Sequence, residues 1–229
     1  MRNCLRENLA DVQNRIERAA RKAGRNPADV RLVAVSKTHG SETLREAIAA
    51  GALVFGENKI QEAESKIAEI GRERVEWHLI GNLQSNKARK AVKLFDVVHT
   101  LDSIELAERL ERICLEENRA RLSVLVQVDL GHEATKNGVE ERDLPPLFEF
   151  LNACRCLSFD GFMIIPPFFE DVEKVRPFFK RLREIRDEVL PSGGGELSMG
   201  MSHDFEIAVE EGATLVRVGT AIFGARENF

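Results

Sequence analysis

Apolar positions near the start of the chain recur at the spacing of an amphipathic helix. They stand every three to four residues among arginines and glutamates, at Leu5, Leu9, Val12 and Ile16. Such spacing places the apolar side chains on one face of a helix and the charged ones on the other. The next apolar run, residues 31–37, is β-branched and ends in polar residues, which is typical of a strand. The sequence therefore predicts a leading helix followed by a strand.

A short apolar run followed by a helical stretch then repeats to the end of the chain. The predicted strands are residues 31–37, 53–57, 77–81, 97–102, 122–130, 158–165, 196–200 and 214–219. The predicted helices are residues 41–50, 59–70, 84–94, 103–118, 140–153, 172–189, 203–211 and 221–228. Strands alternating with helices pair in parallel through right-handed crossovers, and eight such units suit a closed barrel. We therefore predict an α/β fold, a (β/α)8 TIM barrel with an extra N-terminal helix.

An open doubly wound sheet is the alternative architecture. Its usual glycine fingerprint GxGxxG is absent, because the turn after the first strand reads SKTHGSE. No Pro/Gly/Ser-rich linker marks a boundary within the chain. We therefore expect residues 1–229 to form a single domain.

Composition narrows the classes of partner and compartment. The chain has 33 Lys and Arg against 38 Asp and Glu, a net charge of −5, which argues against nucleic-acid binding. No apolar stretch is long enough for a membrane span, and the four cysteines show no CxxC spacing. The five histidines lack HExxH spacing, so we expect no metal site. These features predict a cytoplasmic protein without membrane or nucleic-acid partners.

The strand ends supply a candidate nucleophile. In such barrels the loops that follow the strands share one face, and that face carries the chemistry. Lys37 ends an apolar strand, where partial burial would favour an uncharged amine able to attack a carbonyl. A lysine at a strand end can also simply point into water, so position alone leaves both interpretations open.

The end of the chain supplies candidate anion-binding parts. Ser202 precedes the helix predicted at residues 203–211, and Gly219 and Thr220 follow the last strand. Backbone N–H groups at helix starts, close approach at glycine and a hydroxyl together form a phosphate cradle, which barrels often build after strands seven and eight. An ordinary helix cap is the alternative role of Ser202, and Asp204 would compete with a bound anion.

Two other polar residues have both a structural and a functional interpretation. Arg217 alternates with valines in the last strand, and burial would penalise an unpaired guanidinium. Its partner is a phosphorylated or heteroaromatic ligand at the barrel mouth, an internal residue such as Glu57, or both. Asn58 and Gln61 have the spacing of a capping box, so Asn58 either caps a helix or serves a site.

Six sequence blocks resemble the pyridoxal phosphate homeostasis family. In chain order they read VAVSKTHG, FGENKIQE, WHLIGNLQSNKARK, VQVDLGHEATKNGV, GFMIIPP and LSMGMSHDFEIAVEEGATLVRVGTAIFGAR. The resemblance spans nearly the whole chain and implies a barrel similar to that of alanine racemase. It also implies that Lys37 holds pyridoxal 5'-phosphate as an internal aldimine. The implied noncovalent contacts are Asn58 beside the ring, Arg217 at the pyridine nitrogen, and Ser202, Gly219 and Thr220 at the phosphate.

The resemblance implies buffering or delivery of pyridoxal phosphate (vitamin B6) without catalytic turnover. An arginine at the pyridine nitrogen stays protonated and so weakens the cofactor as an electron sink. The chain also lacks any tyrosine, the second acid/base of the related racemases. A weakly active pyridoxal phosphate enzyme, such as an amino-acid racemase, and a sugar-phosphate aldolase-type barrel remain alternatives.

The expected partners are pyridoxal phosphate and the apo-enzymes that would receive it. No oligomer interface is evident in the sequence, so we expect a monomer. Lys136 is either a second amine for cofactor release or a solvated loop lysine. The arginine-rich first helix contacts either a partner or, as the simpler interpretation, water.

Overall fold

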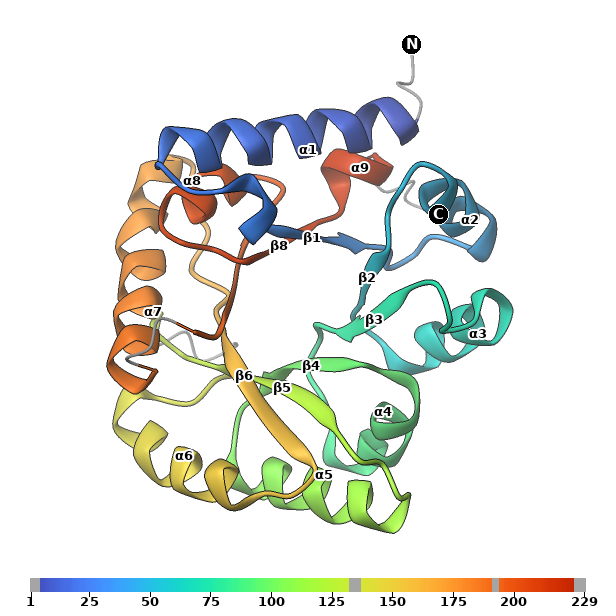
Figure 1. Ribbon diagram of the computed structural model, residues 1–229, viewed down its shortest axis with the longest axis vertical. Coiled ribbons are helices and arrows are strands. Elements are labelled where there is room, and N and C mark those ends of the chain that lie inside the picture. The colour runs from blue at the N-terminus through green and yellow to red at the C-terminus, as the bar shows by residue number, and fades with distance from the viewer. Residues whose placement is uncertain (1–4, 132–136, 191–193, 225–229) are drawn as a thin grey trace.

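Eight parallel strands close into a barrel that is surrounded by helices (Figure 1). The structure is a computed structural model that describes residues 5–131, 137–190 and 194–224. Each strand pairs with its neighbour in sequence order, and β1 pairs with β8 to close the ring. The predicted (β/α)8 barrel with an N-terminal helix is therefore confirmed.

The strands and helices follow the predicted alternation closely. The strands are β1 (Arg31–Val35), β2 (Val54–Glu57), β3 (Glu76–Leu79), β4 (Val97–Leu101), β5 (Leu122–Gln127), β6 (Leu157–Met163), β7 (Glu196–Met201) and β8 (Leu215–Val218). The helices are α1 (Leu5–Lys22), α2 (Ser41–Ala49), α3 (Ile60–Ile70), α4 (Ala88–Leu94), α5 (Ile104–Glu116), α6 (Leu144–Ala153), α7 (Arg176–Val189), α8 (Phe205–Glu210) and α9 (Thr220–Phe223). None of these described helices is both long and apolar enough to span a bilayer.

Two apolar clusters stabilise the barrel from either side of its wall. The larger one lies between the outer face of the strands and the helices, because alternate strand residues face outward and the helices bury one apolar stripe. The smaller one lies inside the barrel and consists of Val33, Val97, Leu125, Met163 and Leu215. The interior is thus a packed core with room for a few polar side chains beside it.

The first strand ends two residues earlier than predicted. β1 stops at Val35, and Thr38 has a φ of 70°, in the left-handed region that a β-branched residue seldom adopts. Lys37 therefore lies in a tight turn at the end of the strand instead of within it.

Some of the basic side chains in α1 and just after it bind other parts of the molecule. Arg15 donates to Glu206 of α8 at 2.7 Å and lies 4.6 Å from the centre of the Phe205 ring. Arg25 donates to the Val209 carbonyl at 2.6 Å. Figure 1 shows α1 lying across α8 and α9. The simpler interpretation of this helix as a solvated face is therefore wrong at these positions.

Candidate functional site

The pairing of β1 with β8 brings the two ends of the chain to one mouth of the barrel. Val33 lies beside Arg217, and Ala34 lies beside Val218. Because the two strands are parallel, the turn after β1 and the loop after β8 emerge at the same end. The His39 ring stacks on Phe223 of α9 with 4.8 Å between ring centres, so the two loops also contact each other. Lys37 and the Gly219–Thr220 segment are consequently neighbours.

The backbone on both sides of Lys37 is held by a buried cluster of charges. Lys66 of α3, only 4% exposed, donates to the Ser36 carbonyl at 2.7 Å, to Glu57 at 2.7 Å and to Glu62 at 2.6 Å. The Ser36 hydroxyl also donates to Glu57 at 2.6 Å. Glu62 in turn accepts the backbone N–H of Thr38. The residues before and after Lys37 are therefore both fixed, while Lys37 itself is half-buried.

Within this cluster the carboxylate of Glu57 is fully buried. Burial raises its pKa, and the hydrogen bonds from Lys66 and Ser36 oppose that rise by stabilising the charged form. No pattern in the sequence singled out Lys66. The only available signal was its position nine residues after Glu57, within the helix predicted at residues 59–70.

Ser202 joins the last two loops instead of capping the helix that follows it. Its hydroxyl oxygen accepts the backbone N–H of Gly219 at 3.3 Å and that of Ala221 at 3.4 Å. Helix α8 begins only at Phe205, and its N-cap residue is Asp204. The interpretation of Ser202 as a cap of that helix is therefore wrong. The hydroxyl and the two amide groups lie together at the mouth, where they match the chemistry of an anion site.

The Asp204 carboxylate is hydrogen-bonded within its own loop. It accepts the Met201 N–H at 2.7 Å, and burial raises its pKa. This fixed hydrogen bond turns the carboxylate toward its own loop. The expected competition between Asp204 and a bound anion is thereby reduced.

Asn58 occupies the mouth next to β2 without capping a helix. Helix α3 has Lys59 as its N-cap residue and no side-chain cap, so the capping box predicted with Gln61 is wrong. The Asn58 Oδ1 atom is buried and has no hydrogen-bond partner among the described residues. Gly81 packs so closely on the Asn58 backbone that a Cβ there would lie 2.2 Å from the carbonyl oxygen. A buried side-chain acceptor without a protein partner, on a closely packed backbone, suits a ligand contact.

Arg217 is buried in the barrel and bonds to neutral acceptors. Its guanidinium donates to the Ser198 hydroxyl at 2.6 Å and to the Ile164 carbonyl at 2.8 Å. Burial lowers its pKa to about 10, so it remains a cation at neutral pH. The alternative of an ion pair with Glu57 is wrong, because Glu57 pairs with Lys66.

Two buried histidines near Arg217 were not singled out by the sequence. His78 on β3 and His99 on β4 are both fully buried inside the barrel. Their strands are adjacent, and each histidine stands at an inward position. That shared position in consecutive strand units was the available signal. Both rings are therefore part of the packed barrel interior.

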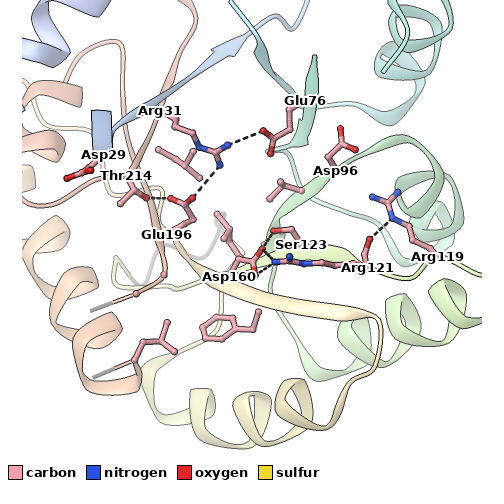
Figure 2. A pocket seen from close by; sticks show the side chains of 17 residues that line it. Asp29, Arg31, Glu76, Asp96, Arg119, Arg121, Ser123, Asp160, Glu196 and Thr214 are labelled. Atoms are coloured by element: carbon pink, nitrogen blue, oxygen red, sulfur yellow. Dashed lines mark hydrogen bonds and ion pairs between the residues drawn. The ribbon is translucent and has the colours of Figure 1, made fainter. Parts of the chain in front are cut away.

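The opposite mouth of the barrel carries a cavity lined by charged residues. A cavity of about 860 Å³ lies at the opposite mouth of the barrel (Figure 2), away from Lys37, and is lined by ion pairs such as Arg31 with Glu76 and Arg121 with Asp160.

No group of three or more potential metal ligands occurs among the described residues. Lys136 lies outside the described residues.

The closed barrel belongs to the alanine racemase class. The family model described as alanine racemase, N-terminal domain, matches residues 8–227. A protein of Aquifex aeolicus named pyridoxal phosphate homeostasis protein is 42% identical over 96% of this chain and 98% of its own length. A Pseudomonas aeruginosa protein of the same name is 45% identical over 96% of this chain and 95% of its own. The chain belongs to the pyridoxal phosphate homeostasis family.

Solved structures agree with this family and its fold. PipY of Synechococcus elongatus, described as having PLP bound, is 39% identical with a TM-score of 0.84, and the match covers 96% of this chain and all of that chain. Alanine racemase of Clostridium difficile is 15% identical with a TM-score of 0.69, and the match covers 98% of this chain and 57% of that one. The second likeness shows the shared fold alone.

Proposed function

We propose that this protein binds pyridoxal phosphate covalently through Lys37 and buffers or delivers it within the cell. The observation that carries the proposal is the meeting of Lys37, after β1, with the hydroxyl and amide groups of Ser202 and Gly219 at one mouth of the barrel. An amine and an anion site at the same mouth suit a molecule with an aldehyde and a phosphate. The relatives named for pyridoxal phosphate homeostasis and the PipY structure with PLP support the same ligand.

Each mouth residue would contribute a distinct interaction. The Lys37 amine would attack the aldehyde carbon, forming a C=N bond as water leaves, and water would reverse the step on release. Ser202, Gly219 and Thr220 would hold the phosphate through hydroxyl and backbone N–H groups. Asn58 would lie beside the ring with its vacant acceptor, and Arg217 would face the pyridine nitrogen. The bound molecule supplies only an electrophilic carbon and an aromatic ring.

Storage without turnover is the role that this site favours. Arg217 keeps its proton, so the pyridine nitrogen beside it would stay unprotonated and would withdraw electrons weakly. The absence of tyrosine from the chain removes the usual second acid/base of the racemases.

We propose a monomer of one domain, residues 1–229, whose recipients are apo-enzymes that need the cofactor. The thiols of Cys114, Cys154 and Cys156 are all unpaired, which supports a cytoplasmic location.

Borohydride reduction followed by mass mapping tests the covalent step. The protein loaded with pyridoxal phosphate should show a visible absorption band that reduction removes, with the added mass on Lys37. The Lys37→Ala variant should lose the band, whereas Lys59→Ala, at an exposed amine of the same mouth, should keep it. Attachment at another lysine would contradict the proposal. Exchange of an amino acid's α-proton with solvent deuterium would reveal an enzyme instead of a carrier.

A further inference from the structure

A hydrogen-bonded chain of polar side chains runs through the barrel interior from one mouth to the other. Its members are, in order, Arg217, Ser198, His99, His78, Glu76 and Arg31. The successive contacts are 2.6 Å from Arg217 Nη1 to Ser198 Oγ, 2.9 Å from Ser198 Oγ to His99 Nδ1, 2.8 Å from His99 Nε2 to His78 Nδ1, 2.9 Å from His78 Nε2 to Glu76 Oε1 and 3.0 Å from Glu76 Oε2 to Arg31 Nη1. Ser198, His78 and His99 are all completely buried.

The far end of this chain is anchored in the cavity of the opposite mouth. Figure 2 shows the Arg31 guanidinium between Glu76 and Glu196. The carboxylates of these two glutamates are similarly exposed, at 34% and 32%. The hydrogen bond from His78 and the positive charge of Arg31 lower the pKa of Glu76. Glu76 therefore stays a carboxylate, which accepts hydrogen bonds and cannot donate them.

An acceptor at one end and a donor at the other fix the direction of every hydrogen bond between them. Burial and the nearby charges lower the pKa of His99 well below its usual value, so His99 is neutral. Because Glu76 can only accept, His78 donates to it from Nε2. Because the Arg217 guanidinium can only donate, Ser198 accepts from it and gives its own proton to His99 Nδ1. The neutral His99 therefore carries its proton on Nε2 and donates it to His78 Nδ1. Both histidines carry their proton on Nε2.

This direction stabilises a cation at the Arg217 end. The negative ends of the Ser198 hydroxyl and of both imidazole rings point toward the guanidinium, and aligned hydrogen bonds polarise one another. The opposite direction would aim a positive end at Arg217 and leave the buried Ser198 proton without an acceptor in the chain. The arrangement accordingly compensates for a buried charge whose direct acceptors are an uncharged hydroxyl and a carbonyl.

We propose that Glu76, His78 and His99 are positioning residues that hold the Arg217 guanidinium, through Ser198, against the ring nitrogen of pyridoxal phosphate. The function of this ring contact rests on the proposed function. The direction of the chain does not, since it is a property of the protein without ligand. Glu76 lies at the mouth opposite Lys37, so its effect on the ring contact would act through the barrel interior.

The direction of the chain can be measured on the protein alone by NMR of ¹⁵N-labelled imidazoles. In the wild type, His78 and His99 should both be Nε2–H tautomers. The Glu76→Gln variant offers an amide that can donate as well as accept, so one or both rings should show Nδ1–H. Glu196→Gln removes a similarly exposed carboxylate and partner of Arg31 without touching His78, and it should change neither ring. An Nδ1–H or charged histidine in the wild type, or unchanged rings in Glu76→Gln, would overturn the inference.

The effect on the ring contact can be measured with 1-deazapyridoxal phosphate, in which a C–H replaces the ring nitrogen. The wild type should prefer pyridoxal phosphate about tenfold, as expected for a hydrogen bond from a charged donor. Glu76→Gln and His99→Phe should reduce that preference to about threefold or less, and Glu196→Gln should keep it. Variants that merely destabilise the fold would weaken both ligands equally and leave the preference intact, which would count against the proposal. Failure of the wild type to bind pyridoxal phosphate would instead refute the proposed function.

Discussion

Lys66 shows how a buried residue on a neighbouring helix can fix the position of a candidate binding residue. Its ammonium group joins Ser36, Glu57 and Glu62, and these contacts fix the backbone just before and just after Lys37. Such a buried ion pair is costly to form, and removing only one partner leaves a buried charge without compensation. The main effect of the cluster is therefore to fix the turn that contains Lys37, and its net contribution to the free energy of unfolding is small.

Replacing Lys66 with methionine tests this role. Lys66→Met leaves the Glu57 carboxylate buried and without its cation, so the free energy of unfolding should fall by about 3 kcal/mol or more. The double variant Lys66→Met/Glu57→Gln removes both charges and should recover much of that loss. Urea unfolding of the two variants and the wild type measures both changes. A double variant less stable than the single one would contradict the ion-pair interpretation.

Residue types at strand ends could be predicted from the sequence, but their partners could not. Alternation of apolar runs and helices placed Lys37, Asn58 and Ser202 at one mouth, because the barrel architecture decides which loops meet. The partner of Ser202 lies in another loop, and that of Glu57 lies on a helix face whose rotation depends on packing. Local spacing carries no such information, which is why the alternative interpretation of Ser202 and Asn58 as helix caps was wrong.

At the scale of elements, the loop after β7 and the loop after β8 act as one unit. The Ser202 hydroxyl accepts two amide groups of the next loop at 3.3 and 3.4 Å, distances at the long end for hydrogen bonds. These long hydrogen bonds are weak, so the two N–H groups can bind a stronger acceptor in place of the Ser202 oxygen. A bound phosphate would be such an acceptor, and the hydroxyl would then donate to it as well.

The Ser202→Ala variant tests this exchange. Loss of a hydroxyl donor to a charged group should weaken binding of pyridoxal phosphate about tenfold, measured by titration of the absorption band. Binding of pyridoxal, which lacks the phosphate, should be unchanged by the same substitution. Ser85→Ala, at an exposed hydroxyl of the loop after β3, serves as the control. Equal weakening of both ligands would show that Ser202 supports the loop without contacting the phosphate.

At the scale of the whole molecule, the repeated strand and helix pattern was sufficient to predict the barrel, its strand order and its leading helix. The content of the interior was not predictable to the same degree. Inward positions carry both an apolar cluster and a polar chain, and only the assembled barrel shows that His78 and His99 touch. The burial of His99 couples the stability of the fold to pH.

The sign of that coupling follows from the lowered pKa of His99. Below its usual pKa of 6.5, the unfolded chain binds a proton at this histidine and the folded chain does not, so the stability contributed above that pH is lost as pH falls. The loss should approach about 1.4 kcal/mol per pH unit below that point. Urea unfolding at about pH 7.5 and about pH 5.5 should show a smaller change for His99→Phe than for the wild type. His203→Phe, at an exposed ring, should retain the full change, and identical changes in all three proteins would show that His99 is protonated in the folded barrel.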